Sequence, residues 1–160
     1  MKIIKPIFKS IFIVLGILAA VVIFLATYLL IQINRSDGQI MTPEGPRNYL
    51  LHVPESYDAG KSTPLVISIH GIAEWPAHQM DLSCWNDLAD EENFIVVYPS
   101  GRNFPLRWRT NGLGESLIDV QFIADMIDRL EKDYNIDSQR IYVNGLSNYG
   151  GMSFQHACTL

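Results

Sequence analysis

The residues with the clearest chemical potential lie in the stretch "GLSNYGG", from Gly145 to Gly151. Ser147 follows the apolar run "IYVNG" and precedes a segment that can continue as a helix. A serine at a strand-to-helix turn has an exposed hydroxyl, and the backbone N–H groups after it point to where an oxyanion forms. We therefore interpret Ser147 as a candidate nucleophile. An ordinary serine turn that caps a helix is the alternative.

A second candidate segment, His70-Gly71-Ile72, follows the apolar run "LVISIH". Ligands of α/β sheets bind beyond the carboxyl ends of the strands, where both segments are expected. Gly71 lets the backbone approach a substrate closely, and this loop can contribute a second backbone N–H to an oxyanion site. We expect His70 to shape the loop by hydrogen bonding rather than to act as a base.

Four apolar runs have the length and composition of buried strands, and they cover residues 49–53, 65–70, 94–99 and 141–145. A capping-box pattern at Ser116, followed by apolar residues at spacings of three and four up to Tyr134, predicts an amphipathic helix. A shorter helix is expected over residues 84–92. Strands that alternate with helices predict an α/β fold, with a mostly parallel sheet covered on both faces.

An apolar run from Ile11 to Ile33 precedes this pattern. As a helix it would extend about 34 Å, which is enough to cross a bilayer. Lysines and no acidic residue precede the run, so the positive-inside rule places the N-terminus in the cytoplasm and the rest outside. We expect a membrane anchor in residues 1–35, a linker in 36–46 and an α/β domain in 47–160. Cleavage of a signal peptide and secretion are the alternative.

All 17 acidic residues follow Arg35, and this acidic balance argues against nucleic acid as a partner. The sequence has no metal-ligand spacing, and we expect neither a metal nor a cofactor. The two cysteines, Cys84 and Cys158, either pair in an oxidising compartment or remain free thiols.

Taken together, these segments resemble the esterase family of the α/β-hydrolase fold that includes polyhydroxybutyrate depolymerases and feruloyl esterases. The resemblance begins at about residue 47 and rests on "YLLHVPESYD", "PLVISIHG", "WNDLADEENFIVVYPSG", "IDVQFIADMID" and "NIDSQRIYVNGLSN". It implies a serine hydrolase of small or polymeric carboxylic esters, with a Ser-Asp-His triad and no cofactor. By this resemblance Ser147 is the nucleophile, and the oxyanion donors are Asn148 and the loop at Gly71 and Ile72.

The sequence departs from the family pattern in two ways. Tyr149 replaces the second glycine of G-x-S-x-G, which we expect to strain or open the turn. After Ser147 there is no acidic residue, and the only histidine, His156, lies about two and a half helical turns further on, away from the site. We therefore expect the chain to be the N-terminal part of a longer hydrolase, with a partial domain in residues 47–160.

Other arrangements stay open. A triad drawn from upstream residues would use His70 or His78 with Asp81 or Asp87. A protein without a triad would be a membrane-anchored binding module or a fragment without function. Trp75, Trp85 and Trp108 are expected to pack in the core rather than line a substrate site. Arg107 and Arg109 are expected to be surface charges or to brace loops rather than bind substrate.

Overall fold

The computed structural model describes residues 4–109 and 113–147. The chain divides into two compact units, Met1–Asn34 and Arg35–Leu160. The first contains helix α1 (Ile4–Ile33), in which the segment Lys9–Ile33 is long and apolar enough to cross a membrane. This finding rests on length and composition, and a signal sequence or a buried core helix meets the same criterion.

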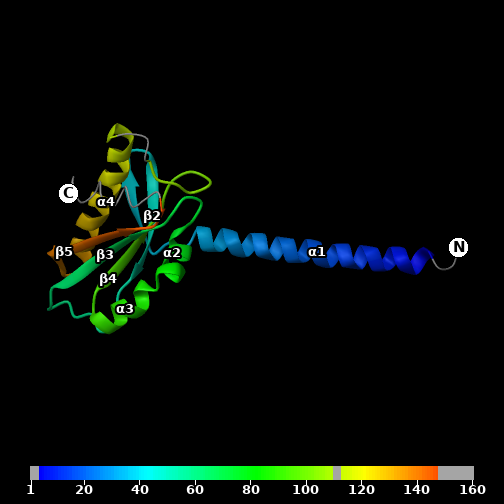
Figure 1. The fold of residues 1–160 in the computed structure, drawn as a ribbon, viewed down its shortest axis with the longest axis horizontal. Helices are drawn as coiled ribbons and strands as arrows, with labels where there is room; N and C mark the ends of the chain where they lie inside the picture. The colour runs from blue at the N-terminus through cyan, green and yellow to red at the C-terminus, as the bar shows by residue number, and fades with distance from the viewer. Residues whose placement is uncertain (1–3, 110–112, 148–160) are drawn as a thin grey trace. The chain divides into compact units, whose positions relative to one another are not determined.

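The described part of the second unit forms a sheet with the strand order β1-β2-β4-β3-β5 (Figure 1). The strands are β1 (Gly38–Thr42), β2 (Gly45–His52), β3 (Thr63–Ile69), β4 (Ile95–Pro99) and β5 (Ile136–Gly145). Strand β3 is parallel to β4 and β5, whereas β2 is antiparallel to β1 and β4. The predicted α/β fold is confirmed, and the described sheet is mixed because β1 and β2 add antiparallel pairings.

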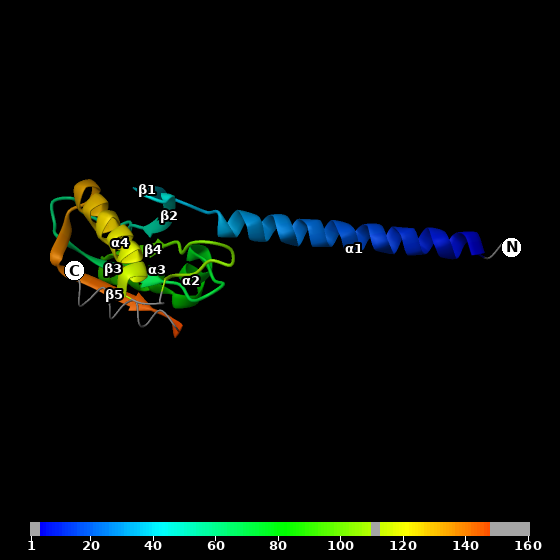
Figure 2. The same ribbon diagram turned by 90° about the horizontal axis from the view of Figure 1, so that it is seen from above.

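Alternate residues of the central strands face opposite sides of the sheet and build two apolar clusters. One cluster packs under α4 (Leu113–Asp133) and includes Leu65, Ile67, Ile69, Ile95, Val97, Phe122, Ile123, Met126 and Leu130. The other packs under α2 (Pro76–Ser83) and α3 (Trp85–Glu92) and includes Leu50, Val66, Val96, Tyr98, Ala77 and Ala89. Helix α4 therefore covers one face, and α2 and α3 cover the other (Figures 1 and 2).

The two predicted helices are present, with one difference at a boundary. Helix α3 corresponds to the predicted segment 84–92. Helix α4 begins at Leu113, so Ser116 lies inside it, and the prediction that a capping box starts this helix is wrong. The predicted inward face is confirmed, because Val120, Ile123 and Leu130 are all buried.

The stretch 36–46, predicted to be a linker, contains strand β1 and the start of β2. The carboxylate of Asp37 accepts a hydrogen bond from Leu51 N–H at 2.8 Å, and the Asp37 N–H donates to Tyr49 O at 2.9 Å. Ile40 packs into the cluster under α4. The stretch is therefore part of the folded sheet.

Candidate active site

The carboxyl ends of β3, β4 and β5 lie at one edge of the sheet because these strands run parallel. Ile69, the last residue of β3, is paired with Gly145, the last residue of β5. Gly71 and Ser147 therefore each stand two residues beyond the same paired position. Leu146 N–H continues the pairing by donating to Ile69 O at 3.3 Å. The structure thus brings the two predicted segments to one edge.

Ser147 is exposed and has a φ of 59°. A positive φ costs a residue with a side chain about 1–2 kcal/mol, because the Cβ atom crowds the following carbonyl oxygen. Backbone strain of this kind is typical of a nucleophilic serine held on a sharp turn. Asn148 and Tyr149, which carry the predicted second oxyanion donor and the altered glycine position, lie outside the described residues.

The loop after β3 engages most of its own backbone N–H groups. Gly71 N–H donates to Glu74 Oε2 at 2.8 Å, although this N–H was predicted as an oxyanion donor. Ala73 N–H donates to Leu106 O at 2.9 Å, and Glu74 N–H donates to Gly71 O at 3.4 Å. Within the described residues, the Ile72 N–H has no hydrogen-bond partner. Of the two positions predicted in this loop, Gly71 has an engaged N–H, whereas the Ile72 N–H has no partner within the described residues.

His70 links the loops that follow β3 and β4. Its side chain is fully buried, its Nδ1–H donates to Gly71 O at 2.7 Å, and its Nε2 accepts from Gly101 N–H at 2.8 Å. Burial is the main cause that lowers the pKa of His70 to about 4. The ring is therefore neutral, and neither nitrogen is free to take a proton from Ser147. His70 shapes the loops, as the sequence predicts.

The lowered pKa of His70 predicts that acid destabilises the fold. The His70 side chain binds a proton near pH 6.5 in the unfolded chain and at about pH 4 in the folded chain. Its contribution to the free energy of unfolding is therefore fully present above pH 6.5 and is lost as the pH falls toward 4. Between about pH 7 and about pH 5 we expect a loss of about 2 kcal/mol in the free energy of unfolding. Urea denaturation in detergent solution at both pH values measures it. His70→Asn should show a much smaller loss, and an equal loss in both proteins would refute the assignment.

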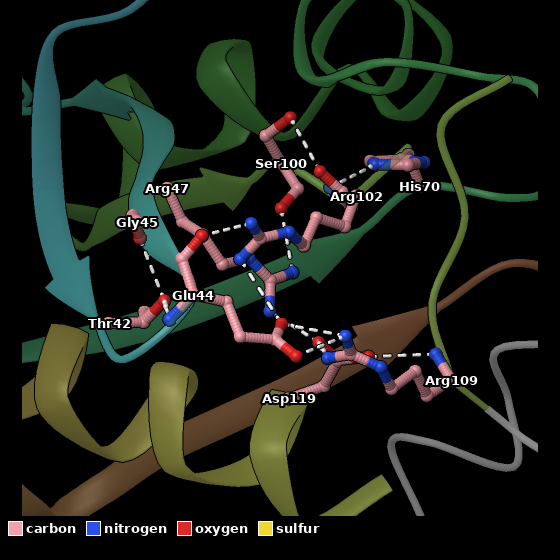
Figure 3. A network of polar contacts seen from close by, with 10 residues as sticks. Thr42, Glu44, Gly45, Arg47, His70, Ser100, Arg102, Arg109 and Asp119 are labelled. Atoms are coloured by element: carbon pink, nitrogen blue, oxygen red, sulfur yellow. Dashed lines mark hydrogen bonds and ion pairs between the residues drawn. The ribbon is translucent and has the colours of Figure 1, made fainter. Parts of the chain in front are cut away.

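A buried ion pair holds the loop after β4 against the sheet and α4 (Figure 3). The guanidinium of Arg47, in β2, is 2% exposed and contacts the carboxylate of Asp119, in α4, which is 1% exposed. Arg47 Nη2 also donates to Ser100 O at 2.9 Å, and Asp119 Oδ2 accepts from the backbone N–H of Arg109 at 2.7 Å. Burial lowers the pKa of Arg47, and the Asp119 carboxylate opposes this shift.

Glu44, in the turn between β1 and β2, extends this network toward the surface (Figure 3). Its carboxylate contacts Arg109 Nη2 at 2.6 Å and Arg102 Nη1 at 3.1 Å. The hydrogen bond from Arg109 is the main cause that lowers the pKa of Glu44. The backbone groups of Arg107 and Arg102 exchange hydrogen bonds at 2.8 and 2.9 Å. The prediction that Arg109 braces a loop is therefore confirmed.

Gly101 stands where the loops after β3 and β4 touch, and it has no room for a side chain. An added Cβ would lie 2.9 Å from Arg107 O and 3.0 Å from His70 Cε1. Because the first of these atoms belongs to the backbone, we expect Gly101→Ala to cost about 1–3 kcal/mol of stability. Gly60→Ala is the control, since its Cβ would meet only the side chain of Asp58. Thermal unfolding compares the variants, and equal midpoints would contradict this packing.

The tryptophans lie mainly in the core. Trp108 is 3% exposed and packs between the rings of His70 and Phe122, with centroid distances of 5.4 and 6.4 Å. Trp75 and Trp85 are partly buried against the cluster under α2 and α3. The prediction of core packing is confirmed for Trp108.

Trp85 also borders a cavity of about 260 Å³ on the α2 side of the sheet. The cavity is lined by Gln79, Leu82, Ser83, Trp85, Asn144, Gly145 and Leu146. The side-chain oxygen of Gln79 has no hydrogen-bond partner among the described residues. This cavity therefore adjoins the two residues that precede Ser147.

The upstream alternative for the triad is not assembled in the described structure. His70 has both nitrogens engaged by backbone groups. The ring of His78 packs against Trp75 at a centroid distance of 5.3 Å, and its Nδ1 has no hydrogen-bond partner in the described part of the chain. His156 lies outside the described residues.

Two further expectations concern cysteine and metal. The thiol of Cys84 is free and exposed, and Cys158 lies outside the described residues. Across the described ranges, no group of three or more histidine, cysteine, aspartate or glutamate side chains is arranged to hold a metal ion.

Comparison with known proteins shows sequence similarity to enzymes that act on esters. No protein-family model matches the chain. It is 37% identical over 107 residues to a bifunctional acetylxylan esterase/xylanase of Neocallimastix patriciarum, covering 67% of this chain and 15% of that protein. It is 34% identical over 128 residues to poly(3-hydroxyalkanoate) depolymerase C of Paucimonas lemoignei, covering 74% and 29%. A probable feruloyl esterase C of Aspergillus clavatus is 32% identical over 118 residues, covering 71% and 41%.

The fold is shared with solved esterase structures. A ferulic acid esterase superposes with a TM-score of 0.60 at 22% identity, covering 75% of this chain and 52% of that one. At this identity the similarity establishes the fold alone. The chain spans 15% to 41% of the length of the three sequence relatives.

Proposed function

We propose that this chain, a member of the α/β-hydrolase esterases by sequence and fold, hydrolyses carboxylic esters through an acyl-enzyme on Ser147. The proposal rests on the placement of Ser147, which is exposed, has a positive φ and follows the strand that pairs with β3. The Ile72 N–H, which lies at the same edge of the sheet and has no hydrogen-bond partner among the described residues, supports it further. The reaction class comes from the relatives, whose names are those of esterases and a depolymerase.

In the proposed reaction, the Ser147 hydroxyl oxygen bonds to the ester carbonyl carbon, and its proton passes to a base. Negative charge develops on the carbonyl oxygen, where the N–H groups of Ile72 and Asn148 stabilise it. The carbon–oxygen bond to the alcohol then breaks, and the alcohol leaves with the proton. Water attacks the acyl-enzyme, which releases the acid and restores the serine.

The base and its partner acid are the components that the described residues do not supply. His70 is neutral and engaged at both nitrogens, and the His78 ring packs against Trp75. All 17 acidic residues of this chain lie within the described ranges. We propose that the imidazole base and the carboxylate correspond to the part of the relatives' length that this chain does not span. The greater length of the relatives is compatible with this proposal, since the chain spans less than half of each.

Turnover of an ester panel tests the proposal. The panel is p-nitrophenyl acetate, acetylated xylan, methyl ferulate and a 3-hydroxybutyrate oligomer, which represent the ester types named in the relatives. We expect hydrolysis of one or more of these esters, and loss of hydrolysis after treatment with an organophosphonate. Saturable binding without hydrolysis would instead support a non-catalytic binding module. A folded protein that neither binds nor hydrolyses any of them would reject both functions.

We also propose that the segment Lys9–Ile33 anchors the chain in a membrane, with residues from Arg35 onward outside the cytoplasm. Its length and apolar composition support an anchor, and Lys2, Lys5 and Lys9 support this orientation. Secretion after cleavage of the segment is the rival outcome.

Fractionation of expressing cells decides between the two outcomes. We expect the protein to stay in carbonate-washed membranes at its full mass of 18.1 kDa and to be digested by protease added outside the cytoplasm. Deletion of residues 2–33 should move it to the soluble fraction. A shortened protein in the medium would establish cleavage instead.

A further inference from the structure

In the short loop after β3, the side chain of Glu74 contacts the backbone of Gly71. Glu74 is partly buried, and its Oε2 accepts a hydrogen bond from Gly71 N–H at 2.8 Å. The same oxygen leaves little room at Gly71, since an added Cβ would lie 2.9 Å from it. Glu74 therefore fixes the peptide group between His70 and Gly71.

The next peptide group is fixed by different contacts. Gly71 O accepts from His70 Nδ1–H at 2.7 Å and from Glu74 N–H at 3.4 Å. In a planar trans peptide the C=O and N–H groups point in opposite directions. Because Gly71 O points toward the buried ring of His70, the Ile72 N–H points away from it. Ile72 is 55% exposed, and its N–H has no hydrogen-bond partner within the described residues.

Ala73 holds the far end of the loop. It has a φ of 60°, and its N–H donates to Leu106 O at 2.9 Å in the loop that follows β4. The peptide groups on both sides of Gly71 are thus held by hydrogen bonds to Glu74 and His70. The turn after Ile72 is held by the hydrogen bond from Ala73 to Leu106. A donor held in this way stabilises a developing charge without reorganising at the moment of reaction.

We propose that Glu74 is a positioning residue that occupies the Gly71 N–H and so leaves the Ile72 N–H as the donor of this loop to the oxyanion. This inference rests on the proposed acyl-enzyme chemistry and deepens it. The role belongs to the acceptor oxygen of Glu74 and not to its charge, because a carboxylate near a developing oxyanion repels it. Glu74→Gln keeps an acceptor oxygen at the same distance along the side chain, whereas Glu74→Ala removes it.

Amide hydrogen exchange of the ¹⁵N-labelled full chain in detergent micelles tests the positioning. In the wild type and in Glu74→Gln we expect a protected Gly71 N–H and a rapidly exchanging Ile72 N–H. In Glu74→Ala the Gly71 N–H should exchange about tenfold faster, as expected for loss of one hydrogen bond. Amides of β4 should be unchanged in all three. Unchanged exchange of Gly71 in Glu74→Ala, or protection of Ile72 in the wild type, would overturn the proposal. If Glu74→Ala fails to fold, Glu74→Asp provides the shortened side chain and the same comparison.

A covalent adduct separates this inference from the proposed function. After reaction with a phosphonate, the Ile72 amide proton should shift downfield, and the Gly71 amide proton should stay in place. A shift at Gly71 with none at Ile72 would refute the role of Glu74 while leaving Ser147 as the nucleophile. If mass spectrometry finds no adduct at Ser147, the proposed function fails, and hydrogen exchange still decides whether Glu74 occupies the Gly71 N–H.

Discussion

Replacement of Ser147 by alanine is expected to reduce ester hydrolysis by at least about a thousandfold, because the proposed acyl-enzyme forms on the Ser147 hydroxyl. The expected effect is on kcat, with little change in KM, since the alanine leaves the surrounding contacts in place. Initial rates with p-nitrophenyl acetate measure it. A small residual rate of hydrolysis in Ser147→Ala is compatible with this mechanism, because the oxyanion donors and substrate binding remain.

Ser62→Ala is the matched control for this prediction. Ser62 is an exposed serine that directly precedes β3, at the opposite edge of the sheet from Ser147. The control should keep wild-type activity. Equal activity in Ser147→Ala and Ser62→Ala would show that hydrolysis, if observed, does not proceed through Ser147.

Asp119→Ala is expected to cause the largest loss of stability among single substitutions in the network shown in Figure 3. It leaves the guanidinium of Arg47, which is 2% exposed, without its carboxylate partner. It also removes the acceptor of the Arg109 backbone N–H. Removal of one partner from a buried ion pair costs about 3–5 kcal/mol. Chemical denaturation in detergent solution measures the change in the free energy of unfolding.

Two comparisons make the reason for this loss testable. The pair between Arg129 and Asp133 is exposed, so Arg129→Ala should cost no more than about 0.5 kcal/mol. The double variant Arg47→Met with Asp119→Leu removes both charges and should recover most of the stability lost in Asp119→Ala. A double variant no more stable than Asp119→Ala would show that the buried charge is not the cause.

The central strands could be predicted because both of their faces are buried. Apart from Ser68, residues 65–69 and 95–99 are apolar, and the structure divides residues 65–67 and 95–98 alternately between the two clusters. Strand β1 could not be predicted in the same way. It lies at the edge of the sheet, and Ile40 is its only buried residue, so its composition resembles that of a turn-rich linker.

The helix boundaries were harder to predict than the helices themselves. Helix α2 follows Trp75, whose side chain provides no capping hydrogen bond, and it has no acidic residue in its first turn. The predicted capping box of α4 included Asp119, whose carboxylate instead contacts Arg47, 72 residues away in the sequence. Local pattern alone does not reveal such a distant partner.

The candidate site was predicted in outline, and its internal hydrogen bonds were not. Apolar runs followed by Gly71 and by Ser147 were enough to place both segments at one edge of the sheet. The engagement of the Gly71 N–H by Glu74 depends on the turn made by Ala73, a non-glycine residue with positive φ. Its sequence signal was an acidic residue three positions after Gly71, and a pattern of spacing does not distinguish that from an ordinary surface charge.

The central claim is that Ser147 is the nucleophile, and mass spectrometry of the folded full chain after treatment with a fluorophosphonate probe tests it most directly. We expect one adduct, located by peptide mapping on Ser147 and absent from Ser147→Ala. An adduct on a different residue, or an unmodified Ser147 in protein shown to be folded, would contradict the account.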